Sequence, residues 1–410
     1  MNILFCERLK AGDLGTYSVH IYEVVNNLLK LGHNVVLMNK NYIRSTTTFD
    51  VSQQSLWSRI KKTLITWRIL RIVRGEVQIL WLFLREIYIF ISASIIILKH
   101  NRKFDVIYRR SHIINSESIL AKLFKIPTVL EVNTINSDEV KTRNFGDRLS
   151  LWIIDRLQRF SVRRADRIIA VTSKLKEALY KDYGVPQDKI TVIQNGADTD
   201  LFKPIDIIEA REKLGLDKNR NYICFVGSLW QVQGLEYLIR SIPLVLEKCP
   251  GTCFMIVGNG PIVNELINLS ESINVSANLI FTGDVPYREV PVYINASDVC
   301  VAPFTLERNE RMGVSPLKLC EYMACQKPVV TSRLDGLEIV EENTAGCLVE
   351  PNSVQELATA IIKLLQDKEL RSHMGENGGR YVRENQSWAI VTRKVAEVCQ
   401  SLHKNTQDGD

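Results

Sequence analysis

Short apolar stretches separated by longer amphipathic ones constrain the fold of this chain more than any other feature. The first such pair is the apolar stretch Ile3–Phe5 and the helical pattern of Tyr17–Leu31. Short strands that are apolar throughout need cover on both faces, which is typical of a parallel sheet between layers of helices. The strands predicted for the first half are Ile3–Phe5, Val35–Met38, Val106–Tyr108, Val129–Val132 and Ile168–Val171.

The same alternation begins again after Pro204, and 410 residues are too many for one ordinary core. We therefore predict an α/β protein of two doubly wound, Rossmann-like domains, residues 1–202 and 203–387. Ligands of such sheets bind at the carboxyl ends of the strands, so the active site is expected in a cleft between the halves. The strands predicted for the second half are Tyr222–Val226, Cys253–Val257, Leu279–Phe281, Val299–Ala302, Pro328–Thr331 and Gly346–Val349.

Composition narrows the class of protein. Hydrophobic residues make up 46% and charged residues 24%, which indicates a globular chain. Nine cysteines are scattered with no CxxC pair, a pattern typical of reduced cytosolic thiols rather than disulfides or zinc ligands. No signal peptide is visible before the first strand, so a cytoplasmic location is expected. We find no metal signature and predict no metal site.

An insertion at about 45–103 concentrates the positive charge. Between Leu56 and Lys103 there are ten Lys and Arg residues but only two Glu, which gives a local charge of +8 in a chain of net charge +6. Tryptophans alternate with these cations, and the uncharged run Ile87–Leu98 is too short to span a bilayer. The pattern favours helices on an anionic membrane surface over nucleic-acid binding. A helix pair packed on the first domain and a short re-entrant hairpin are the alternatives. The predicted membrane contacts are Trp57, Lys61, Lys62, Trp67, Arg68, Arg71 and Trp81.

The segment Gly313–Ala324 carries the strongest chemical signal. It reads as a tight turn and a helix, with Ser315 as N-cap and Pro316 in the first turn. Free amides at a helix start bind anions, and Lys318 adds a full positive charge there. Glu321, one turn further on, is suited to accept hydrogen bonds from a pair of hydroxyls. A diphosphate with a ribose beside it would satisfy both. The alternative is a capped amphipathic helix with a surface Lys and Glu.

Two loops of the sequence are rich in glycine. Ala11–Thr16 follows the first strand and opens a helix, so Gly15 would let a phosphate or sugar approach the backbone, unless this is an ordinary turn. The run Gly258-Asn259-Gly260 lacks a dinucleotide fingerprint, because its third glycine would fall on Val263. This excludes a conventional NAD dehydrogenase.

Taken together, the segments resemble one family, the retaining GT-B glycosyltransferases of family four (glycosyl transferases group 1), in a Ser-Pro-x-Lys-x-x-Glu variant. The resemblance covers nearly the whole chain except about 45–103. Besides Gly313–Ser332, the segments that carry it are Gly32–Val35, Ala165–Thr172, Ile193–Asp198, Phe225–Ser228, Gln233–Leu235, Ile256–Pro261, Phe281–Pro286 and Tyr293–Val299.

The resemblance implies the GT-B architecture, with a last helix at about 388–402 crossing back to the first domain. It implies a nucleotide diphosphate sugar as donor substrate, retention of configuration, and no metal or other cofactor. The acceptor-side residues that it implies are Asn133 and Glu131. The donor-side residues are Gly15, Gly227, Ser228, Gln233, Gly258, Val285, Ser315, Pro316, Leu317, Lys318 and Glu321.

This chain departs from the family pattern at four positions. Ser228 and Gln233 stand where the family usually has Arg and Lys on the diphosphate, and Gly313 replaces the first Glu of a Glu-x7-Glu pair. Asn133 aligns best with a His near the acceptor. We expect Lys318 to compensate, with Arg308 and Arg311 just upstream of it.

The sequence thus predicts a transferase that is peripheral on the inner face of the cell membrane. It would move a sugar to a lipid-linked or cell-surface glycan acceptor, with Lys318, Glu321 and Arg311 as catalytic residues. A nucleotide-sugar epimerase on the same fold is one alternative, although no pair of carboxylates stands out and the basic segment argues against it. A non-catalytic membrane module that binds nucleotide sugars is the other.

Overall fold

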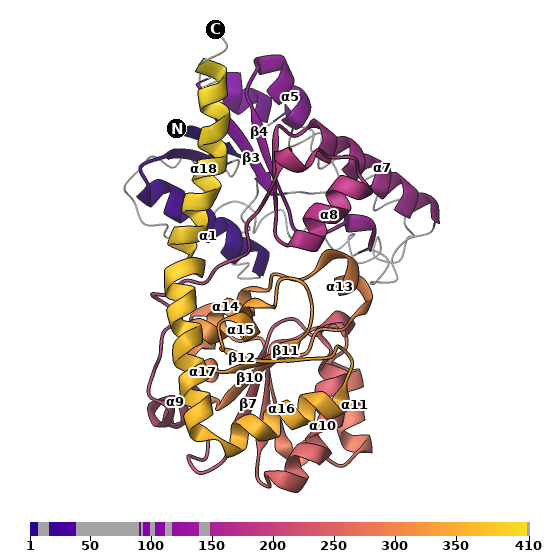
Figure 1. Ribbon diagram of the computed structural model, residues 1–410, viewed down its shortest axis with the longest axis vertical. Coiled ribbons are helices and arrows are strands. Elements are labelled where there is room, and N and C mark those ends of the chain that lie inside the picture. Colours follow the sequence, from indigo (N-terminus) through magenta and orange to yellow (C-terminus); the bar gives the residue numbers. More distant parts are fainter. Residues whose placement is uncertain are drawn as a thin grey trace, which may run out of the picture. The chain divides into compact units, whose positions relative to one another are not determined.

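The computed structural model describes residues 1–6, 16–37, 90–91, 93–98, 103–110, 117–138 and 148–407. The chain forms two compact units (Figure 1). The first unit comprises residues 1–193 with 392–410, and the second comprises 194–391. The predicted loop residue Gly15 lies outside the described residues. So do the seven predicted membrane contacts Trp57, Lys61, Lys62, Trp67, Arg68, Arg71 and Trp81.

The first unit contains a six-stranded sheet of order β2-β1-β3-β4-β5-β6 whose described neighbours all pair in parallel. The five predicted strands are confirmed. The sixth, β6, was not predicted, because it has three residues and only Ile190 is buried. The elements are β1 (Asn2–Phe5), α1 (Thr16–Lys30), β2 (Asn34–Leu37), β3 (Val106–Arg110), α5 (Glu117–Phe124), β4 (Thr128–Val132), α7 (Arg148–Arg164), β5 (Arg167–Ala170), α8 (Ser173–Lys181), a 3-10 turn (Gln187–Lys189) and β6 (Ile190–Val192).

One core of the first unit joins strand residues to the end of the predicted apolar run. Leu4 and Ile107, from adjacent strands, lie in one buried cluster with Ala93 and Ile97 from the helical residues 93–98. The opposite side of this helical stretch is exposed, with Ile95 58% accessible. The described part of the run therefore packs on the domain along one side only. Among the described helices, none is long and apolar enough to cross a membrane.

The second unit has another parallel sheet, of order β12-β11-β10-β7-β8-β9, and all six predicted strands are confirmed. The strands are β7 (Tyr222–Val226), β8 (Cys253–Val257), β9 (Leu279–Gly283), β10 (Val299–Ala302), β11 (Val329–Ser332) and β12 (Gly346–Val349). The helices are α9 (Ile207–Lys213), α10 (Leu235–Lys248), α11 (Val263–Ser272), α12 (Val290–Ala296), α13 (Glu307–Met312), α14 (Leu317–Ala324), α15 (Ile339–Glu342), α16 (Val354–Gln366), α17 (Lys368–Tyr381) and a π-helical turn (Val382–Gln386). The 3-10 turns are η3 (Gln231–Gln233), η4 (Ser276–Asn278) and η5 (Tyr287–Glu289).

The interior of the second unit consists of two hydrophobic cores, one on each face of the sheet. Side chains of β7 point alternately to the two faces of the sheet. Ile223 and Phe225 join the cluster that contains α10 and α16, whereas Cys224 and Val226 join the cluster that contains α12 and α14. Figure 1 shows α10, α11 and α16 gathered on one side of the sheet and α14 on the other. Both faces are covered, which explains why the central strands β7 and β8 are apolar throughout.

A single long helix, α18 (Trp388–Gln407), ends the described chain. Its residues up to Val391 belong to the second unit and those from Thr392 onward to the first. Two backbone hydrogen bonds hold the start of this helix. The Trp388 amide donates to the carbonyl oxygen of Ala197 at 3.0 Å, and the Ala197 amide donates to the carbonyl oxygen of Gln386. The domain boundaries predicted at 202/203 and 387/388 lie a short way along the chain from those of the compact units.

Gly234, at the start of α10, should be among the least replaceable residues of the fold. Its φ of 68° favours glycine, and a Cβ there would lie 1.7 Å from the carbonyl oxygen of Pro303. Gly251 has a similar φ of 83° but open space around a Cβ. We expect Gly251→Ala to lose about 1 kcal/mol of unfolding free energy from the backbone alone, and Gly234→Ala to lose clearly more. Equal losses in urea unfolding would contradict the close approach.

Candidate functional site

Three glycines lie together where neighbouring strands of the second unit end. Gly227 follows β7, Gly258 follows β8 and Gly283 ends β9. The Gly227 amide donates to Val257 O, and the Gly258 amide donates to Gly283 O, both at 2.9 Å. A Cβ on Gly258 would lie 2.1 Å from Gly227 O, so the two loops touch through their backbones. This is the edge of a parallel sheet at which ligands bind.

The turn before α14 is fixed by contacts to distant backbone. Gly313 has a φ of 64°, and a Cβ there would lie 2.6 Å from Asp335 O. The Val314 amide donates to that same carbonyl at 2.9 Å. The N-cap position falls on Pro316, and the predicted cap at Ser315 is wrong, because the Ser315 hydroxyl accepts from the Asn195 amide instead, at 2.9 Å. Among the described residues no side chain caps α14, so its first amides are suited to an anion.

Lys318 is the central cation of this site. Its Nζ donates to Gln233 Oε1 at 2.7 Å. It lies 3.8 Å from the centroid of the Phe225 ring and 5.5 Å from that of Phe304. A Cβ on Gly227 would stand only 2.6 Å from Nζ, so glycine is what makes room for the ammonium group. The charge is thus held by a neutral amide oxygen and two aromatic faces.

Glu321 lies one turn beyond Lys318 on the same helix and is 5% exposed. Its Oε1 accepts from the Tyr287 hydroxyl at 2.8 Å. The Tyr287 ring packs against Phe202, with ring centroids 5.3 Å apart. This tyrosine therefore holds the carboxylate in place from η5.

Burial moves the pKa values of Lys318 and Glu321 toward neutrality. Desolvation lowers the pKa of Lys318 to about 7, although the neighbouring Glu321 opposes this change. Desolvation raises the pKa of Glu321 to about 7 against the hydrogen bond from Tyr287 and the charge of Lys318. A bound anion would restore the full charge of Lys318. Perturbed pKa values at a strand edge mark a candidate functional site.

The structure brings most predicted donor-side residues of the second unit to one place. Lys318 donates to Gln233 and lies against Gly227, and Glu321 follows on the same helix. Ser228 directly follows Gly227 and is exposed, and Val285 packs at the edge of the core beside α12 and α14. Leu317 is buried as the first residue of α14.

The structure gives less support to Arg308 and Arg311, the two arginines expected to assist Lys318. Arg311 is exposed near the end of α13, and the side chain of Arg308 lies outside the described residues.

Sequence reasoning missed the groups that surround these residues. Phe225, Phe304 and Tyr287 had no assigned role, and Asn195 was noted only within a motif. The hydroxyl of Tyr322 accepts from the Val226 amide at 2.7 Å, which ties α14 to the end of β7. Only Tyr287 offers a signal in the sequence, because it lies two residues after Val285, a predicted donor-side residue.

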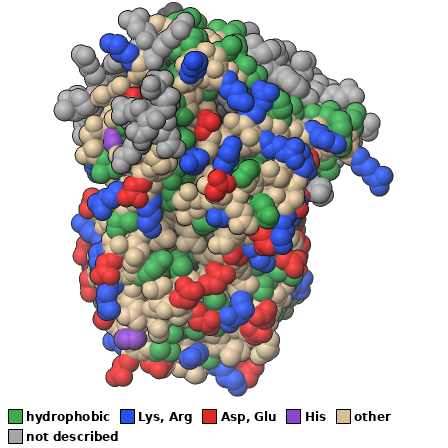
Figure 2. Space-filling view, turned by 45° about the horizontal axis from the view of Figure 1, so that its top comes forward, with side chains coloured by type: hydrophobic (Ala, Val, Ile, Leu, Met, Phe, Trp, Pro, Cys, Tyr) green, Lys and Arg blue, Asp and Glu red, His purple; other side chains and the backbone are tan. Residues whose placement is uncertain are grey.

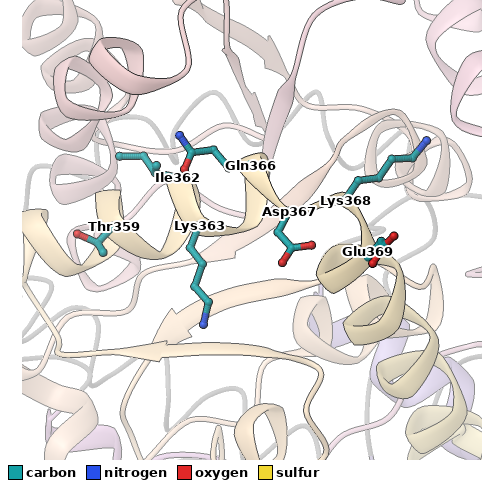
Figure 3. A pocket seen from close by; sticks show the side chains of 7 residues that line it. All are labelled: Thr359, Ile362, Lys363, Gln366, Asp367, Lys368 and Glu369. Carbon is teal, nitrogen blue, oxygen red and sulfur yellow. The ribbon is translucent and has the colours of Figure 1, made fainter.

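A shallow surface hollow lies elsewhere, at the junction of α16 and α17 (Figure 3). Its polar groups belong to local structure, since Asp367 caps α17 by accepting from the Leu370 amide at 2.8 Å. It shares no residue with the Lys318 site. Its lining residues are Thr359, Ile362, Lys363, Gln366, Asp367, Lys368 and Glu369.

In the first unit, the predicted acceptor-side residues belong to a buried polar cluster at the ends of β3 and β4. Glu131 is 2% exposed, and its Oε2 lies 2.9 Å from His20 Nε2 and accepts from the Tyr108 hydroxyl. Its Oε1 accepts from Asn133 Nδ2 at 2.9 Å and lies 3.4 Å from Arg110 Nε. Arg110 also donates to Asn133 Oδ1 at 3.0 Å.

These contacts define what Glu131 can do. Burial alone would raise the pKa of this carboxyl, but His20, Arg110 and Tyr108 outweigh it and hold the pKa well below its usual range. A carboxylate so fully paired is a poor base. Glu131 instead holds Arg110 and Asn133 in place where the parallel strands end.

We expect Glu131→Gln to cost about 3–5 kcal/mol of unfolding free energy, because it leaves buried cations without their carboxylate. Glu236→Gln is the matched control, since Glu236 forms an exposed pair with Arg240 that should contribute less than about 1 kcal/mol. The measurement is urea unfolding at neutral pH. A Glu131→Gln protein as stable as the control would show that the cluster does not depend on this charge.

Comparison with known protein families agrees with this geometry. Residues 17–201 match the family described as Glycosyltransferase Family 4, and residues 206–381 match Glycosyl transferases group 1. The two matches together take in both halves of the chain.

Individual relatives are moderately similar. The chain is 26% identical over 404 residues to D-inositol 3-phosphate glycosyltransferase of Corynebacterium diphtheriae, covering 95% of this chain and 90% of that protein. It is 28% identical over 256 residues to a GDP-mannose-dependent alpha-(1-6)-phosphatidylinositol monomannoside mannosyltransferase of Mycolicibacterium smegmatis, covering 60% and 66%.

Solved structures share the fold. Sucrose-phosphate synthase from Thermosynechococcus elongatus superposes with a TM-score of 0.70 at 17% identity, covering 98% of this chain and 99% of that one. Anabaena HepE in complex with UDP superposes with a TM-score of 0.69 at 19% identity, covering 98% and 100%. The two parallel sheets, the order of the motifs and the family matches lead to one conclusion: this chain belongs to the group 1 glycosyltransferases and has their two-domain, Rossmann-like GT-B fold.

Proposed function

We propose that this protein transfers a sugar from a nucleotide diphosphate sugar to a lipid-linked or cell-surface glycan acceptor, with retention of configuration and without a metal ion. One observation carries the proposal. Lys318 stands at the uncapped start of α14, beneath Gly227, and Glu321 follows one turn later. Cation, free amides and carboxylate are spaced for a diphosphate with its attached ribose.

The diphosphate would lie against the start of α14. The helix amides and the Lys318 ammonium are the donors that it needs, and the glycine loops let it approach the backbone. Gln233 holds Lys318 toward this position. Arg311 is the second cation that we propose for the diphosphate, reaching it from α13.

The ribose would bind at Glu321. A buried carboxylate with one oxygen occupied by Tyr287 keeps acceptor capacity for hydroxyl groups. The proposal is also supported by Anabaena HepE, a protein of the same fold that was solved with UDP, and by the Mycolicibacterium relative, whose name specifies GDP-mannose.

The chemistry would be electrostatic. As the bond from the sugar to the diphosphate breaks, negative charge grows on the departing phosphate, and Lys318 with the amides of α14 stabilises it. The acceptor hydroxyl attacks from the face that the donor leaves, and its proton passes to the departing phosphate. The cation supplied by the chain takes the place that a metal ion has in other transferases.

For the membrane, we propose that the basic insertion holds the enzyme on the anionic inner surface of the cell membrane, where a lipid-linked acceptor would be found. Exposed Ile91, Ile95 and Leu98, at helical spacing in the described part of that segment, support this. The Mycolicibacterium relative, whose name specifies a phosphatidylinositol monomannoside mannosyltransferase, is consistent with such an acceptor.

The donor can be identified by thermal shift with UDP-, GDP-, ADP- and CMP-sugars, with and without magnesium. We expect one nucleotide sugar to stabilise the protein without metal. Lys318→Ala should abolish most of this shift and lower turnover at least tenfold. Arg311→Ala should have a smaller effect, because that side chain is exposed. Stabilisation without turnover would favour the non-catalytic module, and no stabilisation by any donor would contradict the proposed site.

Donor affinity should depend on pH. Since the pKa of Lys318 is about 7 and a bound diphosphate favours the charged form, binding takes up a proton. Affinity for the nucleotide sugar found above should therefore fall as pH rises past 7, by up to about tenfold per unit. Lys318→Arg, always charged, should remove this slope. Lys318→Met should bind weakly at every pH. A slope retained in Lys318→Arg would assign the titration to another group.

The basic insertion can be tested by flotation with vesicles. Changing Lys61, Lys62, Arg68 and Arg71 to Glu should abolish binding to mixed phosphatidylcholine and phosphatidylglycerol vesicles, because each cation near an anionic surface contributes about 1 kcal/mol. Vesicles of phosphatidylcholine alone are the control. If the variant floats as well as the wild type, the insertion has no role in membrane binding.

A further inference from the structure

Helix α7 has an outward stripe of an unusual kind. Every third or fourth residue from Leu149 onward faces solvent, and three of the most exposed are large and apolar. Leu149 is 62% exposed, Trp152 57% and Phe160 46%. We call Leu149, Trp152, Arg156 and Phe160 the α7 stripe. The solvent side of a helix is normally polar, so this side requires an explanation.

The other sides of α7 are occupied. Ile154 and Gln158 are buried on the inner side. A third side contacts the end of α8, where Arg163 Nε donates to Tyr183 O at 2.6 Å and the Tyr183 hydroxyl donates to Asp155 at 2.6 Å. The α7 stripe is therefore the one side that this helix does not use for its own packing within the described part of the first unit.

Arginine side chains lie on the exposed aromatic rings. The guanidinium carbon of Arg156 is 5.4 Å from the centroid of the Trp152 ring, and that of Arg164 is 4.1 Å from the centroid of the Phe160 ring. The single acid of α7, Asp155, is turned toward Tyr183 and Arg159 and so contributes no negative charge to the stripe. Figure 2 shows Lys, Arg and hydrophobic side chains side by side on the flank where α7 lies in Figure 1.

From this arrangement we propose that the α7 stripe is a second membrane-contact surface, which lays Trp152 and Phe160 among the headgroups of an anionic bilayer. Tryptophan is enriched at the membrane interface, where an apolar ring meets a polar environment. Arginines beside the rings match lipid phosphates in charge and geometry. The inference deepens the proposed function, on which it rests for a lipid-linked acceptor, and it adds a contact separate from the basic insertion.

The test compares vesicle flotation of the wild type with that of the double variant Trp152→Ser, Phe160→Ser and with that of Arg156→Glu, on mixed phosphatidylcholine and phosphatidylglycerol vesicles. We expect at least about tenfold weaker binding for the double variant and a smaller loss for Arg156→Glu. The matched control is Ile208→Ser with Arg240→Glu, which changes an exposed apolar residue and an exposed arginine of the second unit. It should float like the wild type.

Trp152→Phe supplies a readout that misfolding cannot imitate. This variant should still float, but with brominated lipid it should lose the part of the tryptophan fluorescence quenching that arises from Trp152. Unchanged quenching would place Trp152 outside the bilayer and overturn the proposal.

The remaining outcomes are separable. If the double variant floats normally, the stripe is not a membrane contact. If the wild type is a dimer in solution and the double variant a monomer with unchanged flotation, the stripe joins two copies of the chain, and the membrane proposal fails. Thermal shift by the donor should be the same in wild type and double variant. If no nucleotide sugar produces a thermal shift in the wild type, the proposed function itself is contradicted, whatever the flotation shows.

Discussion

The partly buried ammonium group of Lys318 is the constraint on which the donor side of this protein depends. Desolvating a charge is costly, and here its hydrogen-bond acceptor is the neutral amide oxygen of Gln233. The aromatic faces of Phe225 and Phe304 recover part of that cost. The rest is left for a ligand to supply, which is why the pKa of Lys318 falls toward 7 in the free protein. A diphosphate would complete the site.

The buried cluster of the first unit is the opposite case. Glu131 contacts a histidine, an arginine, a tyrosine and an amide, so its charge is compensated within the domain. Such a group contributes rigidity where strands β3 and β4 end. One unit thus holds a satisfied charge that fixes side chains, and the other holds an incompletely satisfied charge that can bind. The two pKa directions express this difference.

The sheets could be predicted from the sequence because central strands such as β7 and β8 are buried on both faces and are therefore apolar throughout. Strand β6 could not be predicted in this way, because two of its three residues are exposed. The position of Lys318 on α14 was readable from local pattern, but its pairing with Gln233, 85 residues away, was not. Ser315 illustrates the same limit, since a good capping residue gives its oxygen to Asn195 from a different loop. Local propensity cannot weigh such tertiary competitors.

The contacts also explain how the departures from the family pattern fit together. A lysine at position 233 would place a second ammonium group where Gln233 now meets Lys318 at 2.7 Å, and two like charges at that distance repel strongly. Gly227 has a φ of 140°, which favours glycine, and a Cβ there would stand 2.6 Å from Nζ, so a larger residue would also displace the ammonium group. Glutamine at 233 and lysine at 318 therefore form one arrangement, in which the cation that we propose for the diphosphate would come from α14 instead of η3. Residue by residue, the site has lost the cations expected at positions 228 and 233. The contacts show that one cation is still present there, on α14 instead of η3.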